Sequence, residues 1–495
     1  MKIYYCTKLT VFLLVLAATP LFAQLNMTAQ VRTRTEYRDG QGTLSVPNAS
    51  PTVFTNQRTR LNIGFNADRY RLFTAVQDVR VWGMDASSIG NSDGQRFFMH
   101  EGWAEIIFND TTFLKGIDNL SLKVGRQEIV YDDARLLGNL DWLQQGRRHD
   151  AAIIRFKKGT WWADAGFAFN QHREKKNQGT VYVGVPYPPT PGTDSLAVSA
   201  PASSNFIGTH YKSFQYLYLA KEIGFTRISG LFFKDDFQKP GDPAKRFTRS
   251  EGVNSRITGG VAVFSKVRRK HVVNGYFYYQ GNNDVTGNTM DAYMAGANVL
   301  LAAGRKLSVG PGVDYLSGND LTKPSKVNRR FDPLYGTPHK FWGLMDYFYV
   351  ADPYGLNGNN NLSPGLINAF LNVRYKMRDN LLIMLDIHEF YAGNKVPDLR
   401  TADPDDKMES RLGTEIDLIL NYSLAKQVNV EAGYAVMFGT ETLDRLKAPA
   451  GNKSNVGQWA YLQLNIRTDL IGGITDKLKA LTKDIEEINK KINQQ

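Results

Sequence analysis

Cysteine and long apolar runs are both scarce in this chain of 495 residues. Cys6 is its one cysteine. It lies in a basic start that is followed by an apolar run at 11–18 and by the small residue Ala23, a pattern that predicts a secretory signal peptide over residues 1–23. The run is too short to span a bilayer, which takes about 20 residues. Cleavage after Ala23 leaves no cysteine, so disulfides and thiol catalysis are excluded for the mature chain.

Catalytic and metal-binding motifs are also missing from the sequence. There is no His-Glu-x-x-His pattern, no Gly-x-Ser-x-Gly elbow and no phosphate loop. The seven histidines are scattered singly. His388 shares a predicted strand face with Asp386, and a structural hydrogen bond explains this pair better than acid–base catalysis. We therefore predict that the chain is not an enzyme and needs no cofactor.

Eighteen short segments alternate residue by residue between an apolar and a polar face. Arg58 and Arg60, for example, alternate with Leu61 and Ile63. A period of two places successive side chains on opposite faces of a strand. Strands that are apolar outside and charged inside are typical of a closed barrel in lipid around a wet lumen. The predicted strands are 27–37, 57–67, 70–82, 97–109, 120–131, 147–157, 161–171, 210–221, 224–235, 255–265, 271–281, 290–303, 306–317, 365–377, 380–391, 410–423, 428–438 and 456–467.

The connections between these segments alternate between tight polar turns and long loops. Residues 67–69 and 377–380 are tight turns, whereas the longest loops are 172–209 and 318–364. Short periplasmic turns, long external loops and an even strand count are typical of bacterial outer-membrane barrels. The sequence therefore predicts an all-β protein, an 18-stranded antiparallel transmembrane β-barrel over residues 24–468. A soluble β-sandwich is disfavoured because its turns are evenly spaced.

Charged residues are predicted to line the lumen, because a charge on the lipid face costs about 2–4 kcal/mol at mid-depth. The net charge of +12 and the excess of inward arginines over acids predict an anion-selective lumen, since a narrow channel concentrates ions of opposite charge. An arginine–carboxylate ladder along the lumen wall explains any single arginine equally well. Nucleic-acid binding is disfavoured because the arginines form no single outer patch. The predicted inward arginines are Arg32, Arg34, Arg58, Arg60, Arg256, Arg374, Arg411 and Arg467, and the inward acids are Glu36, Asp164, Asp386, Glu415, Asp417 and Glu431.

The loop 318–364 contains too many large apolar residues for a solvated connection. They are concentrated at 331–335 and 341–346. We predict that this loop packs inside the barrel mouth and narrows the channel. A lid outside the barrel, packed by its own side chains, is the alternative.

Several short stretches resemble the alginate export family of outer-membrane barrels. The resemblance implies an 18-stranded barrel with an arginine-lined constriction that passes an anionic polysaccharide such as alginate. It implies that this constriction is lined by Arg58, Arg60, Arg126, Arg155 and Arg467. The stretches that carry it are Gly125-Arg126-Gln127-Glu128, Arg135-Leu136-Leu137-Gly138, Asp141-Trp142, Arg147 to Asp150, Tyr315-Leu316-Ser317-Gly318-Asn319, Phe331-Asp332-Pro333-Leu334-Tyr335 with His339, Gly343 and Asp346, and Gly413-Thr414-Glu415-Ile416-Asp417.

The C-terminal residues 469–495 follow a different period. Apolar residues between 471 and 492 recur at spacings of three and four, which predicts an amphipathic periplasmic helix with an a/d repeat. One interpretation is a coiled coil that joins barrels into a homo-oligomer or binds a periplasmic protein partner. The other is a single helix folded over the mouth of its own barrel. The repeated residues are Ile471, Ile474, Leu478, Leu481, Ile485, Ile488 and Ile492.

These patterns predict a pore in the outer membrane of a Gram-negative cell, surrounded by outer-membrane lipid, with its C-terminus in the periplasm. The arginine-rich lumen favours an anion-selective pore for acidic polysaccharide or oligosaccharide. A general porin for small solutes is one alternative. A structural barrel that recruits a periplasmic partner through its C-terminal helix is another.

Overall fold

The computed structural model describes most of the chain between residues 25 and 471. The predicted signal peptide lies outside these residues, as does the predicted C-terminal helix beyond residue 471. No helix in the described part is long and apolar enough to cross a membrane. The described residues are 25–83, 97–108, 116–170, 173–175, 179–181, 211–239, 252–323, 325–349, 354–356, 362–398, 400–401, 406–447 and 454–471.

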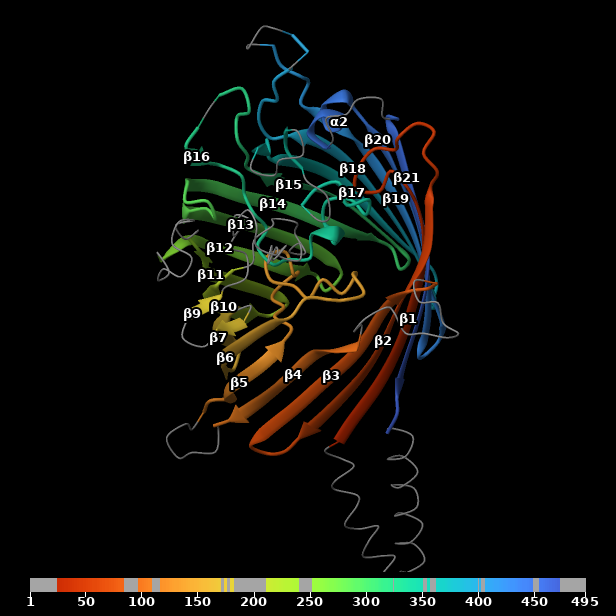
Figure 1. Cartoon of the computed structure of the whole chain (residues 1–495). Coiled ribbons are helices and arrows are strands. Elements are labelled where there is room, and N and C mark those ends of the chain that lie inside the picture. The colour runs from red at the N-terminus through yellow and green to blue at the C-terminus, as the bar shows by residue number, and fades with distance from the viewer. Residues whose placement is uncertain are drawn as a thin grey trace, which may run out of the picture.

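Eighteen antiparallel strands close into a β-barrel, as predicted. Each strand pairs with its neighbour in sequence, and β1 pairs with β21 to close the ring; the two lie side by side in Figure 1. The barrel strands are β1 (Leu25–Asp39), β2 (Thr52–Asn66), β3 (Tyr70–Val81), β4 (Phe97–Ile107), β5 (Asn119–Gln127), β6 (His149–Lys158), β7 (Trp161–Phe169), β10 (Ser213–Ile223), β11 (Thr226–Gln238), β12 (Val253–Val267), β13 (His271–Asn283), β14 (Thr289–Ala303), β15 (Leu307–Leu316), β17 (Leu366–Arg378), β18 (Leu381–Ala392), β19 (Arg411–Ala425), β20 (Val428–Gly439) and β21 (Val456–Asp469).

Five short elements of the described part lie outside the barrel wall. Strands β8 (Arg173–Lys175) and β9 (Gly179–Val181) pair only with each other. Strand β16 (Val327–Asn328) pairs in parallel with β14. The other two are one helical turn, η2 (Pro338–Lys340), and one short helix, α2 (Glu441–Lys447).

The alternation in sequence becomes an alternation of surfaces. Along β1, Gln30, Arg32, Arg34 and Glu36 are buried, whereas Val31 between them is exposed. Since the barrel is closed, the buried face is the lumen side and the exposed apolar face is the side that meets lipid. Aromatic residues stand on this outer face near both strand ends, as interfacial girdles do; they include Tyr70, Trp161, Phe225, Tyr279, Tyr293 and Phe438.

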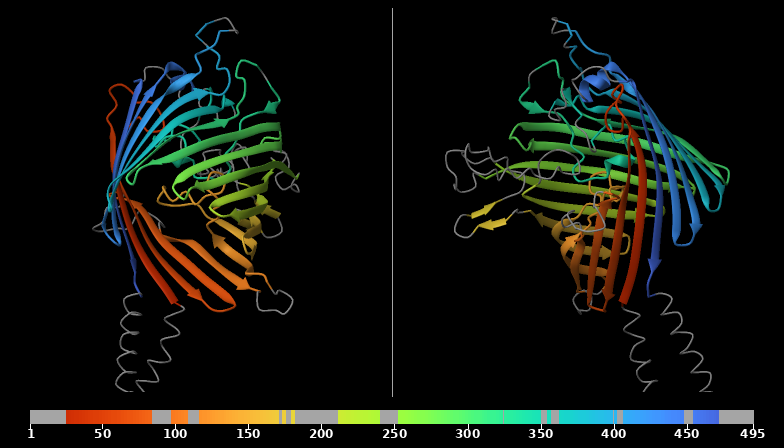
Figure 2. Two further views of the ribbon diagram at one scale, coloured as in Figure 1. Left: turned by 180° about the vertical axis from the view of Figure 1, so that it is seen from behind. Right: turned by 45° about the vertical axis from the view of Figure 1, so that its right-hand side comes forward.

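Two connections turn into the barrel instead of away from it (Figures 1 and 2). The first inserted segment, residues 128–148, joins β5 to β6, and the second, residues 325–349, belongs to the connection between β15 and β17. The second lies in the loop 318–364 that the sequence predicted to enter the mouth; the first was not anticipated as an insertion. The segments are joined to each other by a parallel bridge between Leu137 and Tyr335. The lumen core is therefore built largely from two loops.

Candidate pore constriction

Four arginines lie side by side on the lumen face of β1 and β2. Arg32 and Arg58 are cross-strand partners, and strand alternation adds Arg34 and Arg60 to the same face. All four side chains are buried. Burying a guanidinium without a partner is costly, so the partners of this cluster determine what it does.

The partners of the arginines come mainly from the first inserted segment. Asp141 accepts a hydrogen bond from Arg58 Nη1 on Oδ1 (2.7 Å) and one from Arg32 Nη1 on Oδ2 (3.1 Å). Arg34 donates to the backbone carbonyl of Trp142 (2.8 Å), and its guanidinium lies 3.8 Å from the centre of the indole ring. A hydrogen bond with a charged donor is stronger than one between neutral groups. A cation over an indole ring adds a further electrostatic attraction. These arginines therefore hold the inserted segment against the β1–β2 wall.

The charges at this contact fix the ionisation of Asp141. Burial opposes the charged form, but the guanidinium groups of Arg58 and Arg32 outweigh it and lower the pKa of Asp141. Arg34 pairs instead with Glu36 at 2.8 Å. The cluster meets fewer carboxylates than it has arginines, so the wall at β1–β2 remains positive.

A second charged contact anchors the start of the first inserted segment. Glu128 Oε1 lies 2.7 Å from His100 Nε2 and 3.7 Å from Arg60, and Oε2 accepts from Asn139 (2.8 Å). Burial opposes its charge, but the hydrogen bonds from His100 and Asn139 lower the pKa of Glu128.

The same corner holds a geometric candidate for a cation site. His100, Glu101 and Glu128 present ligand atoms within 4.8 Å of one another. Arg60 and His100 already contact the carboxylate of Glu128, however. Glu101 accepts a hydrogen bond from the backbone N–H of Glu128 (3.0 Å). These contacts explain the cluster without a metal ion.

Further contacts lock the two inserted segments together. Arg135 of the first segment lies 3.8 Å from the ring centre of Phe341 in the second, and it reaches Asp314 of the wall at 3.3 Å. Trp142 stacks on His339 with ring centres 4.3 Å apart. Movement of one segment is therefore resisted by the other.

The second inserted segment is held by apolar packing, by backbone hydrogen bonds to acids and by the buried ion pair of Asp332 with Arg256 of β12. Phe348 is fully buried, with its ring centre 4.5 Å from that of Phe390 on β18. Glu415 of β19 accepts the N–H of Met345 (2.8 Å). Gly343 has φ +83°, and a Cβ there would lie 2.5 Å from both carboxylate oxygens of Glu415. Only glycine lets the chain approach these acids so closely.

The other predicted inward arginines are spread around the barrel. Arg256 is buried between two acids: its Nη2 lies 2.5 Å from Oδ2 of Asp235, and its Nη1 lies 2.9 Å from Oδ2 of Asp332. Arg374 pairs with Asp386. Arg155 lies 3.5 Å from Asp164 and 3.9 Å from Glu105, and its side chain is 37% exposed.

Arg467 lies on the same face of β21 as Gln463 and Asn465 and is exposed near the turn end. All of these arginines share the lumen side of the wall. Arg467 is the cross-strand partner of Gln30 on β1 and so adjoins the β1–β2 cluster, whereas Arg256 and Arg374 lie on β12 and β17.

Arg126 and Arg411 differ from the prediction, because both lie on the outer face. Arg126 alternates with buried Gln127 and pairs with Asp150, with both side chains about half exposed. Arg411 pairs with Glu389 (2.6 Å). The register of β18 and β19 shifts next to Arg411. This bulge turns Leu412 inward and Arg411 outward, which regular alternation could not predict.

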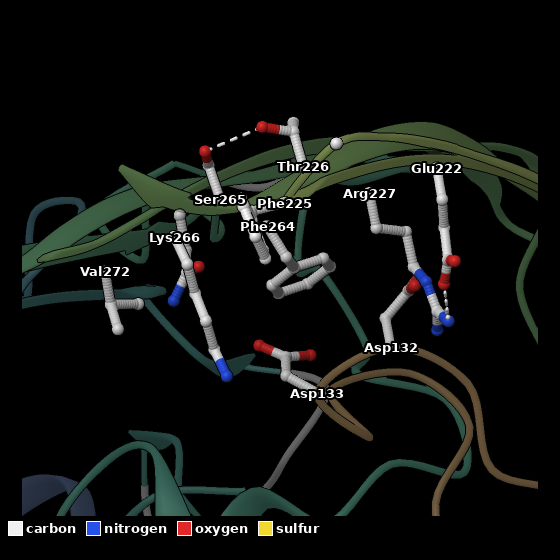
Figure 3. A pocket seen from close by; sticks show the side chains of 12 residues that line it. Asp132, Asp133, Glu222, Phe225, Thr226, Arg227, Phe264, Ser265, Lys266 and Val272 are labelled. Carbon is white, nitrogen blue, oxygen red and sulfur yellow. Dashed lines mark hydrogen bonds and ion pairs between the residues drawn. The ribbon is translucent and has the colours of Figure 1, made fainter. Parts of the chain in front are cut away.

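A cavity of about 650 Å³ separates the first inserted segment from the wall at β11–β13 (Figure 3). Asp133 of the segment faces Lys266 and Phe264 of β12 across it, and Asp132 lies beside Arg227 of β11. Asp132 is held by Tyr218 and Ser229 of the wall. The segment is thus bonded to the wall at β1–β2 and also at β10–β11, with the cavity beside the second contact.

The sequence pattern does not reveal the residues that contact the arginines. Asp141, Trp142 and His339 belong only to the stretches that resemble the alginate export family. The contact between Asp141 and Arg32 joins residues 109 positions apart. No local period could reveal it.

The comparison with known families bears on the first part of the barrel. The profile of the alginate export family matches residues 23–185. The resemblance to this family is confirmed. The match covers β1–β7 and the first inserted segment, whereas the stretches at 315–319, 331–346 and 413–417 lie beyond it. No curated protein sequence matches the chain.

Solved structures share the fold with little sequence identity. Pseudomonas aeruginosa OccK5 (OpdH) is 10% identical with a TM-score of 0.54, over 91% of this chain and 99% of its own. OpdO of the same organism is 13% identical, with a TM-score of 0.54 over 91% and 98%. Acinetobacter baumannii OccAB2 is 10% identical, with a TM-score of 0.52 over 91% and 99%. The family match and the barrel together support an outer-membrane pore.

Proposed function

We propose that this protein is an anion-selective outer-membrane pore that passes acidic polysaccharide or oligosaccharide, with its C-terminus in the periplasm. The observation that carries the proposal is the buried cluster of Arg32, Arg34, Arg58 and Arg60 on the lumen wall. The four guanidinium groups of this cluster outnumber the carboxylates that contact them. Positive charge between low-dielectric walls attracts anions and raises their local concentration.

The chemistry of the lumen suits a sugar acid better than a simple anion. The planar guanidinium matches a carboxylate with two parallel hydrogen bonds. Arg155 and Arg374 add partly exposed guanidiniums elsewhere on the wall, with 37% and 26% of their side chains accessible. A chain of uronates could exchange one arginine contact for the next.

Passage of a large solute requires the inserted segments to move, because both lie across the lumen. A general porin for small solutes is the second candidate, favoured by the density of contacts between these segments. The two functions differ in their response to oligouronates, which should interrupt the current of the first and leave that of the second unchanged. Recruitment of a partner by the C-terminal helix concerns residues outside the described part and remains a prediction from sequence.

Arg155 and Arg126 offer a matched test of selectivity in planar bilayers. Both are arginines on neighbouring strands with a carboxylate partner, but Arg155 faces the lumen and Arg126 faces outward. We expect Arg155→Gln to lower the anion-to-cation permeability ratio on the order of twofold, measured from the reversal potential under a salt gradient. Arg126→Gln should match the wild type. A cation-selective wild type, or equal effects of both changes, would contradict the proposal.

A further inference from the structure

In the two ion pairs that Asp141 forms with Arg32 and Arg58, the carboxylate is exposed and the guanidinium groups are buried. The side chain of Asp141 is 42% accessible, whereas those of Arg32 and Arg58 are 5% and 0% accessible. Solvent in the lumen therefore reaches this ion-pair cluster through the carboxylate. The arginines belong to the rigid wall, and the carboxylate belongs to a loop.

We propose that Arg32 and Arg58 form a carboxylate-binding site that Asp141 fills when no substrate is present, and that the carboxylate of a uronate displaces it to release the first inserted segment. The inference rests on the proposed passage of acidic saccharides. It assigns to Asp141 the role of a tethered competitor for the substrate.

The geometry of the contact is that of a bound carboxylate ligand. Each oxygen of Asp141 accepts from a different guanidinium, one on β1 and one on β2. Arg58 Nε is buried with no hydrogen-bond partner among the described residues. A free carboxylate, which is not restrained by a loop, could engage this unused donor as well.

The backbone around Asp141 is held in a costly conformation. Leu140 has φ +47°, in the left-handed region that non-glycine residues avoid. Six of the ten described non-glycine residues with positive φ lie in the two inserted segments; they are Asp132, Ala134, Leu140, Leu334, Asp346 and Tyr349. Such strain persists only where surrounding contacts enforce it. Loss of the arginine contacts would therefore favour relaxation of the segment.

The lumen also holds open space beside the start of the segment. The cavity of about 650 Å³ beside Asp132 and Asp133 lies between the segment and β11–β13.

The same contact makes opening selective for anions. If Asp141 left the site empty, two buried guanidiniums would lose their shared counter-charge, which is strongly unfavourable. An incoming carboxylate restores that charge at once, and a neutral sugar does not. The exchange forms and breaks only hydrogen bonds and ion pairs, so no proton or electron is transferred.

The test is the concentration dependence of the change in chloride current on adding glucuronate, measured in single-channel recordings of the full-length pore with glucose as the neutral probe. Asp141→Asn removes the competing charge. Asp133→Asn is the matched control, because Asp133 lies in the same segment but pairs with Arg135 instead. We expect the half-saturating glucuronate concentration to fall about tenfold in Asp141→Asn, as expected when a tethered competitor is removed, and to stay unchanged in Asp133→Asn. Glucose should have no effect on any of the three.

A measurement on the wild type keeps the inference testable if Asp141→Asn does not fold. Hydrogen exchange of the peptide over 138–148 should become faster with glucuronate and not with glucose. Unchanged exchange, or equal glucuronate constants in both variants and the wild type, overturns the inference while an anion-selective current leaves the proposed function standing. A wild-type pore without anion selectivity overturns the proposed function itself.

Discussion

The two inserted segments occupy one lumen and each combines ion pairs with buried apolar side chains, but their ion pairs differ in exposure. The side chain of Asp141 in the first is 42% accessible, whereas that of Asp332 in the second is 5% accessible. The first, 128–148, meets the wall through the ion pairs of Asp141 with Arg32 and of Glu128 with Arg60. The second, 325–349, buries large apolar residues such as Trp342 and Phe348 completely. Ion pairs can be exchanged for those of a charged ligand, whereas apolar burial has no such competitor. The comparison suggests a movable segment that rests on a fixed one.

The largest effect is expected where the fixed segment loses its packing. Phe348→Ala should lower the free energy of unfolding by about 3–5 kcal/mol, because it leaves a cavity against Phe390 and Tyr354. Lys340→Ala, at an exposed position of the same segment, should change it by less than about 0.5 kcal/mol. Urea titration of the detergent-folded barrel measures both. Equal effects would show that the second segment is not held by apolar burial.

A smaller effect is expected where the fixed segment meets the acids of β19. Gly343→Ala adds a left-handed alanine and a clash with Glu415, and should cost about 2–4 kcal/mol. Gly304→Ala is the control: its φ is +88°, but a Cβ there meets nothing within 4 Å, so only the backbone cost of about 1–2 kcal/mol applies. The same titration compares them. A Gly343 variant no less stable than the Gly304 variant would mean that the segment shifts freely.

The smallest effect concerns the movable segment between pH 7 and pH 5. The pKa of Asp141 is lowered from its ordinary 3.8, so its stabilising charge is fully present above that value and is lost only as pH falls through the lowered pKa. We therefore compare the open probability of the wild type with that of Asp141→Asn at each pH. The difference between the two should be the same at pH 7 and at pH 5. A change in that difference would show that Asp141 titrates near neutrality and is not paired as described.

The sequence by itself determined the wall of this protein. Alternation along segments such as 52–66 and 456–469 depends only on the two-residue period of a strand, which any stretch of chain reveals locally. It correctly predicted eighteen strands and their order. It also predicted that part of the loop 318–364 packs inside the mouth.

Only the tertiary structure decided what the lumen arginines bind. Asp141 reaches Arg32 and Arg58 because β5 and β6 deliver their connection across the barrel to a wall far away in sequence. The outward turn of Arg411 likewise depends on a register shift between two strands. Pairing across the lumen and slippage between strands are properties of the closed barrel, and neither leaves a period in the sequence.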